Sequence, residues 1–243
     1  MTDNLITELP WDSQFFGKRI GRVQINTEFD LARFKDELSS RKMDLIYMNV
    51  ESKELVQKTN QQIAKKHQLR AVGRRVDFSL KNPPLINSER LKVERVQNNT
   101  PADRLHDLAF LAGEYSRYKI DPNFLTSDFI RLYKAWIDNS IKGIIADSVF
   151  HVVSGGVKSI GLITTKNSND YLRIGLIAVD PSTQGKGVGK SLIEKAIQEA
   201  TNTNLTEIRV ATQMENEKAC AFYEKMNFKM TSKTFQFHVW INR

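Results

Sequence analysis

The sequence predicts an α/β protein in which a mixed central sheet is flanked by helices and preceded by a small α/β domain. Two observations support this fold class. Apolar runs that alternate with a period of two, as strands do, are interleaved with amphipathic runs that have the period of a helix. One apolar run, residues 172–179, leads through the glycine-rich sequence Gln184–Gly189 into an amphipathic run, residues 189–200.

The first part of the chain alternates strand and helix. We expect strands at Arg19–Ile25, Met43–Val50 and Leu69–Leu80, with helices at Glu28–Arg41 and Lys53–His67 between them. In the third strand, apolar side chains recur at every second position and therefore share one face: Val76, Phe78 and Leu80. Paired prolines within Lys81–Asn87 cannot lie inside a helix or a central strand. We therefore place a boundary there, between a domain of residues 1–84 and one of residues 92–243.

The second part begins with two helices and a hairpin. The helices are expected at Pro101–Tyr115 and Ser127–Ile141, and the hairpin joins Val149–Ser154 to Val157–Thr165 through a Gly-Gly turn. Further along, a helix from Gly189 to Ala200 carries one apolar stripe, which is expected to pack against the sheet: Leu192, Ile193, Ala196, Ile197 and Ala200.

Three elements complete the predicted fold. Glu207–Gln213 reads as a short strand, and Glu215–Phe228 reads as a helix that ends at Asn227, a residue that tolerates the left-handed conformation of a helix stop. Thr234–Ile241 alternates apolar with more polar residues, as a closing strand would. The chain shows no internal repeat.

The glycine-rich turn indicates an anion site. A strand, a turn with alternating glycines and a helix N-terminus together present backbone N–H groups that a phosphate can approach closely. The turn fits neither the P-loop pattern, whose first glycine would stand at Gln184, nor the dinucleotide pattern, whose third glycine would stand at Lys190. It matches Q/R-x-x-G-x-G/A and so resembles the pyrophosphate loop of the GNAT acetyltransferases, over about residues 149–240.

The resemblance extends to the following helix, where Asn216 and Tyr223 lie seven residues apart and hence on one helix face. It implies that Asn216 contacts the pantetheine arm of acetyl-CoA and that Tyr223 is the general acid for the departing thiolate. The alternative is that Tyr223 only packs with Phe222. The resemblance also implies that backbone N–H groups near Leu176–Ala178 receive the thioester oxygen. The expected cofactor-binding residues are Leu176, Ile177, Ala178, Val179, Gln184, Gly185, Lys186, Gly187, Val188, Gly189, Lys190 and Asn216.

The chain also resembles a narrower group, the TDP-fucosamine acetyltransferases, over most of its length. The segments that carry this likeness include Leu9–Gly17, Tyr115–Pro122, Tyr133–Trp136 and Arg209–Gln213. This likeness implies that the acceptor is a nucleotide-linked amino-deoxysugar, with Arg117 and Lys119 as candidates for its phosphates. The alternatives are a protein, polyamine or aminoglycoside amine, or a CoA-binding module without activity.

Composition limits the partners. The formal net charge of +8 suits anionic ligands, yet the basic residues form no block, and no aromatic-rich strip accompanies them, so we expect no nucleic-acid partner. The four histidines lack metal-type spacing, and no metal is expected. One cysteine, no secretory signal and no apolar run long enough to span a membrane lead us to expect a cytoplasmic protein. The sequence is compatible with a homodimer.

Overall fold

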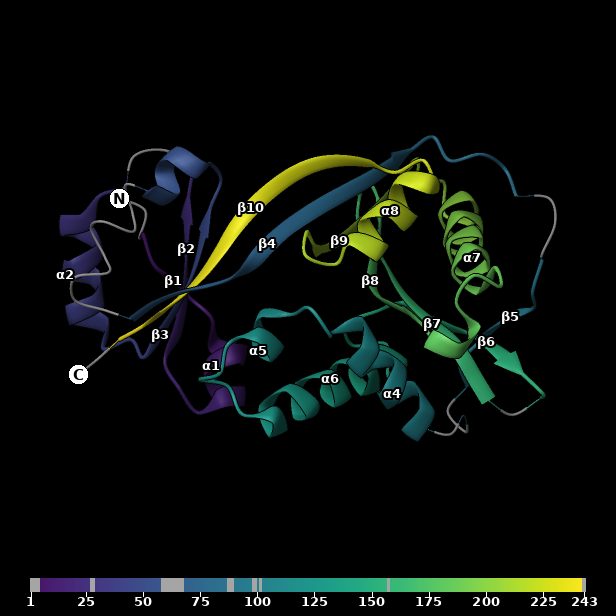
Figure 1. Ribbon diagram of the computed structural model, residues 1–243, viewed down its shortest axis with the longest axis horizontal. Coiled ribbons are helices and arrows are strands. Elements are labelled where there is room, and N and C mark those ends of the chain that lie inside the picture. Colours follow the sequence, from purple (N-terminus) through teal and green to yellow (C-terminus); the bar gives the residue numbers. More distant parts are fainter. Residues whose placement is uncertain are drawn as a thin grey trace.

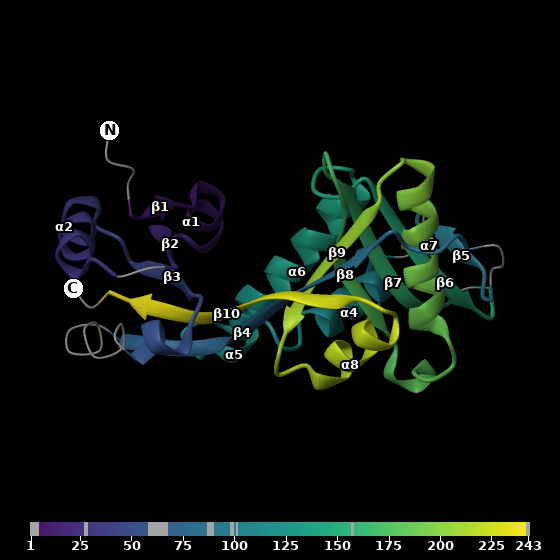
Figure 2. The ribbon, with the colours of Figure 1, turned by 90° about the horizontal axis from the view of Figure 1, so that it is seen from above.

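The computed structural model describes residues 5–26, 29–57, 68–86, 90–97, 100, 102–156 and 158–241. Its strands form one 10-stranded mixed sheet in the order β1-β2-β3-β10-β4-β9-β8-β7-β6-β5, with helices packed on both faces (Figures 1 and 2). The predicted fold class, an α/β protein with a mixed sheet flanked by helices, is confirmed.

The strands are β1 (Thr7–Glu8), β2 (Ile20–Ile25), β3 (Leu45–Val50), β4 (Gln68–Lys81), β5 (Val93–Arg95), β6 (Ser148–Ser154), β7 (Lys158–Asn167), β8 (Leu172–Val179), β9 (Glu207–Gln213) and β10 (Lys229–Trp240). The helices are α1 (Pro10–Phe16), α2 (Leu31–Arg41), α4 (Ala102–Ala112), α5 (Arg117–Ile120), α6 (Thr126–Ile141), α7 (Val188–Asn202) and α8 (Glu217–Lys225), with one 3-10 turn, η1 (Pro181–Thr183). Most of the expected helix Lys53–His67 lies outside the described residues. The sequence did not predict α1, α5, β1 or β5.

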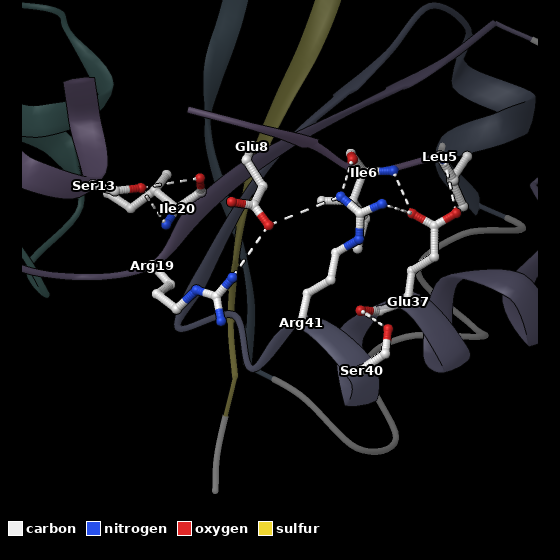
Figure 3. Close-up of polar contacts among 9 residues, drawn as sticks. All are labelled: Leu5, Ile6, Glu8, Ser13, Arg19, Ile20, Glu37, Ser40 and Arg41. Carbon is white, nitrogen blue, oxygen red and sulfur yellow. Dashed lines mark hydrogen bonds and ion pairs between the residues drawn. The ribbon is translucent and has the colours of Figure 1, made fainter. Parts of the chain in front are cut away.

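The N-terminal part packs α2 on a small sheet. β2 and β3 are parallel, and β1 pairs antiparallel with β2. Asp30 caps α2, because its carboxylate accepts the N–H of Arg33 at 3.0 Å. Glu37 of the same helix accepts the N–H groups of Leu5 and Ile6, each at 2.9 Å (Figure 3). The helix therefore holds the chain segment that leads into the edge strand β1.

The strand β10 lies inside the sheet, between β3 and β4. Phe235 pairs with Val50 on one side and with Arg74 on the other. The sequence predicted a shorter closing strand with one polar face, whereas β10 begins at Lys229 and buries both faces near its end: Gln236 and His238 are 8% and 0% exposed. Its polar side chains are buried because helix α5 and the loop that follows it cover this face.

The strands β4 and β10 form a long ribbon that joins the two ends of the molecule (Figure 1). At one end β10 pairs with β3, and at the other β4 pairs with β9. The division into residues 1–84 and 92–243 stays a prediction. Under it, a strand of the second domain completes the sheet of the first.

The C-terminal part has a helical layer on each face of the sheet. On one face, α4 packs against β7 and β8, and α6 packs against α4 and β6, with Leu105, Leu108 and Ile137 in the core between them; α7 and α8 cover the other face. The stripe predicted for α7 is buried, as expected, from Leu192 to Ala200. This two-sided packing fixes the start of α7 at the end of β8.

Candidate active site

The strands β8 and β9 separate part of the way along their length. They pair in parallel only at Leu172 with Ile208, Arg173 with Arg209 and Ile174 with Val210, although β8 continues to Val179 and β9 to Gln213. Past these pairs, the edge of β8 that faces β9 has no strand to bond. The sheet therefore offers main-chain donors and acceptors to a ligand at this opening.

A β-bulge lies at the point of separation. The register between β7 and β8 shifts between Ile163 and Thr165, and a Cβ on Gly175 would lie 2.8 Å from the Thr164 hydroxyl. Glycine is required there by this close approach. The bulge also changes the side of the sheet to which alternate β8 side chains point. Ile174 packs in the core beneath α7, whereas Leu176, two residues later, packs on the opposite side with α4 and α6.

The hydrogen bonds of β8 show which amides face the opening. The N–H of Leu176 donates to the Thr164 hydroxyl at 2.8 Å, and the N–H of Asp180 donates to the carbonyl of Ile160 at 2.8 Å, both on the β7 side. N–H groups alternate sides along a strand. The amides of Ile177 and Val179 therefore face the opening, whereas that of Leu176 is already bonded. Within the expected segment 176–179, the amides that a ligand at the opening could bond are therefore those of Ile177 and Val179.

The glycine-rich turn connects β8 to α7. Gly185 and Gly187 have φ angles of +79° and +88°, a conformation that side chains rarely adopt. Gly187 is the N-cap of α7 and offers no side chain to the helix, so the N–H groups of Val188, Gly189 and Lys190 lack intrahelical acceptors. These amides, together with the positive end of the helix dipole, make an anion-binding surface.

Two close contacts fix this turn. Val188 is buried and packs over Gly161 of β7, where a Cβ would lie 2.5 Å from Val188 Cγ1. Gly189 lies against Phe222 of α8, whose ring is 3.2 Å from the place of a Cβ. The other predicted loop residues, Gln184, Gly185 and Lys186, are exposed, and Lys190 Nζ lies 3.7 Å from the Glu194 carboxylate.

Asn216 is the N-cap of α8 rather than a residue inside a longer helix. Its side-chain carbonyl accepts the N–H of Ala219 at 3.2 Å, and the helix begins at Glu217. The amide NH₂ group points away from this bond and remains a donor. At the other end Asn227 adopts the left-handed conformation, with φ of +65°, as the sequence predicted.

Tyr223 lies on α8 among aromatic side chains. Its ring is 5.5 Å from that of Phe78 and 5.8 Å from that of Phe228, and the residue is 3% exposed. Burial raises the pKa of the Tyr223 phenol well above its usual range, so the hydroxyl keeps its proton at neutral pH. The phenol is therefore present in the protonated form that a general acid needs, although burial also makes it a weaker acid than an exposed tyrosine. Packing with Phe222, the other interpretation, is also present, at 5.6 Å.

The two candidate phosphate ligands do not point to the same place. The Arg117 guanidinium lies 3.9 Å from the centre of the Tyr47 ring and donates to the Tyr118 hydroxyl at 2.9 Å. The Lys119 ammonium lies 4.9 Å from the Phe129 ring and is exposed. The ion pairs found among the described residues do not include one to Arg117. Its charge is half-buried at the seam between α5 and the N-terminal part.

A buried polar cluster beside Arg117 was not predicted from the sequence. Asp121, which ends α5, accepts from His238 Nδ1 at 2.6 Å and from Trp240 Nε1 at 2.9 Å, and its carboxylate lies 3.6 Å from Arg70 Nε. The cluster therefore attaches α5, and with it Arg117, to both strands of the β4–β10 ribbon. A histidine inside the apolar run Phe235–Ile241 was the one signal that could have pointed to it.

Within the described part of the chain, no group of three or more His, Cys, Asp or Glu side chains is arranged to hold a metal ion. A search of the same residues finds no helix with the length and apolar character of a membrane span.

The C-terminal part of the chain is similar to a known protein family. The family profile described as "Acetyltransferase (GNAT) family" matches residues 114–228, which include β8, the glycine-rich turn and α8. The match confirms the predicted resemblance.

Two curated relatives carry sugar-related names. A dTDP-fucosamine acetyltransferase of Escherichia coli O6:H1 is 28% identical over 242 residues, which cover 98% of this chain and 97% of that protein. The spore coat polysaccharide biosynthesis protein SpsD of Bacillus subtilis is 26% identical over 125 residues, or 51% of this chain, which spans 43% of that protein.

Solved structures show the same fold at low sequence identity. A conserved protein of unknown function from Staphylococcus epidermidis aligns over 100% of this chain and 93% of its own, with a TM-score of 0.68 and 11% identity. A GCN5-related N-acetyltransferase from Sphaerobacter thermophilus aligns over 92% of this chain and 74% of its own, with a TM-score of 0.60 and 11% identity. The first of these alignments includes the N-terminal part.

Proposed function

We propose that this chain, which contains an acetyltransferase domain of the GNAT family, transfers an acetyl group from acetyl-CoA to the amine of a nucleotide-linked amino-deoxysugar, of the TDP-4-amino-4,6-dideoxyhexose type. Acetyl-CoA would supply the activated acetyl thioester. The amides of Val188–Lys190 would bind its pyrophosphate, and the amides of Ile177 and Val179 would bond the pantetheine arm and the thioester oxygen. The NH₂ group of Asn216, which has no hydrogen-bond acceptor among the described residues, would be a further donor to the pantetheine arm.

The residues at the opening support direct transfer. The acceptor amine attacks the thioester carbon, the C–N bond forms as the C–S bond breaks, and the amine gives up one proton. Tyr223, which is protonated at neutral pH, donates its phenolic proton to the departing sulfur. The proton that the amine gives up would pass to water.

One observation carries the choice of acceptor: the half-buried guanidinium of Arg117, which stands apart from the CoA turn. The guanidinium has no direct ion pair among the described residues, although the Asp12 carboxylate stabilises its charge through the Tyr118 hydroxyl. A half-buried charge without a direct partner is a candidate for contact with an anionic ligand. A sugar diphosphate matches a guanidinium in charge and geometry. The similarity to a dTDP-fucosamine acetyltransferase over 98% of this chain supports the same acceptor class.

The test is an acetyl-transfer assay that follows release of free CoA thiol with a panel of acceptors. We expect a TDP-linked 4-amino-4,6-dideoxyhexose to be acetylated with a kcat/KM far above that of the free amino sugar, because binding of the remote nucleotide orients the amine. Arg117→Ala should raise the KM for the conjugate at least about tenfold, as loss of a charge-assisted contact does, while the KM for acetyl-CoA stays unchanged. Equal kcat/KM for conjugate and free sugar, or preference for a polyamine, an aminoglycoside or a protein amine, would refute the proposal.

A further inference from the structure

Trp11 is an exposed aromatic side chain in a part of the chain that the CoA site does not use. It lies on α1 and is 51% exposed, the largest exposed fraction of any aromatic ring among the exposed large apolar residues of the described chain. Single exposed apolar residues are common on soluble proteins and by themselves need no explanation. What distinguishes Trp11 is how its ring is supported and what lies beside it.

The Trp11 ring is backed by a stack of side chains. The centres of the Trp11 and Phe15 rings lie 4.8 Å apart, and the two ring planes are nearly parallel, at 15°. The Phe15 ring in turn carries the Arg131 guanidinium at 4.6 Å and meets Phe16 edge to face at 5.0 Å. Because Phe15 covers one face of the indole and half of the residue is still exposed, the other face is open to solvent.

The short helix that carries Trp11 is held at several points. The Ser13 hydroxyl accepts the N–H of Ile20 at 2.9 Å, and Arg131 of α6 donates to the carbonyl of Phe15 at 3.0 Å. Phe16 is buried in the core. The indole is therefore presented in one orientation, and a flat ligand would not have to order it on binding.

The open indole face and Arg117 belong to the same seam. Asp12, the next residue after Trp11, accepts from the Tyr118 hydroxyl at 3.4 Å, and this hydroxyl accepts from Arg117 at 2.9 Å. α1, α5 and the start of α6 meet where the N-terminal part faces the acetyltransferase part (Figure 1). A ligand with its phosphates at Arg117 has an aromatic platform on the adjoining helix.

We propose that Trp11 is the stacking platform for the nucleobase of the acceptor, an inference that rests on the proposed function. A pyrimidine ring fits the open indole face, because every base has a π-face that stacks on an aromatic side chain. The neighbouring charges agree with a nucleotide. Arg131 lies over the Phe15 ring that backs the indole, and Arg117 is linked to α1 through Tyr118 and Asp12. The carboxylates of Asp12 and Asp128 are already bonded to Tyr118 and Arg131. A base held here would place the diphosphate at Arg117 and leave the sugar to extend toward the opening of the sheet.

Calorimetric titration of thymidine diphosphate into the full chain saturated with CoA tests the proposal. We expect Trp11→Ala to weaken binding roughly tenfold to hundredfold, the range found when a base loses its stacking partner. Trp11→Phe keeps an aromatic face and should stay within about threefold of the original chain. The control is Ile144→Ala, which truncates an apolar residue that is even more exposed, at 63%, after the end of α6. This change should leave the affinity for thymidine diphosphate unaltered.

A second titration separates base from phosphate. Inorganic pyrophosphate lacks the base, so Trp11→Ala should leave its affinity unchanged while Arg117→Ala lowers the affinity for both ligands. If the original chain binds thymidine diphosphate and Trp11→Ala binds it equally well, the platform is refuted and the acceptor proposal stands. If the original chain does not bind it at all, both are refuted. If Trp11→Ala instead converts a dimer to a monomer in sedimentation without affecting nucleotide affinity, the indole face is a contact between copies and the proposal is wrong.

Discussion

Replacing Asp121 should test whether α5 is attached to the ribbon as the structure shows. The Asp121 carboxylate has no solvent exposure and accepts from His238, Trp240 and the N–H of Asn123, at 2.6, 2.9 and 3.0 Å. Asp121→Ala removes all three acceptor contacts at once. The donors that remain have lost their partner inside the protein.

The size of the effect follows from what is left unpaired. A buried donor without an acceptor costs about 1–3 kcal/mol. Asp121→Ala leaves His238 and the N–H of Asn123 without their acceptor, whereas the half-buried Trp240 can regain a bond to water. We therefore expect Asp121→Ala to reduce the free energy of unfolding by about 2–5 kcal/mol. Asp121→Asn, which keeps an acceptor oxygen but not the charge, should cost about half as much.

Urea unfolding followed by circular dichroism measures these losses, provided that the m-value is unchanged. The matched control is Asp138→Ala. This change breaks a second Asp–His pair, in which the Asp138 carboxylate lies 2.8 Å from His106. The Asp138 side chain is 41% exposed. The control should cost less than about 1 kcal/mol, as exposed pairs do. If Asp121→Ala cost no more than the control, the cluster would not hold α5 and our reading of it would be wrong.

Three further predictions concern the site and pH. Tyr223→Phe should lower turnover by about 10²–10⁴, with CoA affinity unchanged, because only the acid is lost; turnover near that of the original chain would show that the thiolate leaves without this proton. Gly187→Val should lower CoA affinity measured by calorimetry, through a side chain beside the turn amides; Gly143→Val, at another open glycine with φ of +76°, controls for backbone strain and should leave CoA affinity intact. Burial lowers the pKa of His238 to about 4 in the folded chain, whereas a histidine in the unfolded chain titrates near pH 6.5. Between these values the unfolded chain binds a proton that the folded chain does not bind. The free energy of unfolding should therefore fall by about 2–3 kcal/mol as the pH drops from 6.5 to 4. His238→Asn, which can still donate to Asp121 but does not titrate, should remove that part of the slope in urea unfolding at each pH, and an unchanged slope would contradict the assignment.

The fold class and most elements could be predicted because they depend on local pattern. The α7 stripe and the left-handed stop at Asn227 are short-range features, since hydrophobic period and backbone preference are properties of a few neighbouring residues. The glycine-rich turn could be predicted for the same reason, because the positive φ angles at Gly185 and Gly187 favour glycine at these positions.

The rest depends on pairing between distant segments, which no local pattern encodes. The place of β10 between β3 and β4, and hence the burial of His238 beside Asp121, follows from which strands meet. The bulge at Gly175 decides which β8 amides face the opening, and a sequence with one glycine in a strand does not show that the Thr164 hydroxyl will bond Leu176. The short helix α5 lies below the length at which periodicity can be recognised.

The interior position of β10 has a consequence for synthesis of the chain. β3 ends at Val50, and its antiparallel partner β10 is made only after residues 51–228 have been translated. Domains usually fold in the order in which they leave the ribosome, but here the first strands keep one edge without its partner until β10 emerges. An unpaired edge of this kind is a template for pairing with other chains. A nascent chain that stops before Lys229 would therefore be prone to aggregate, and the N-terminal part gains its final sheet last, although it is made first.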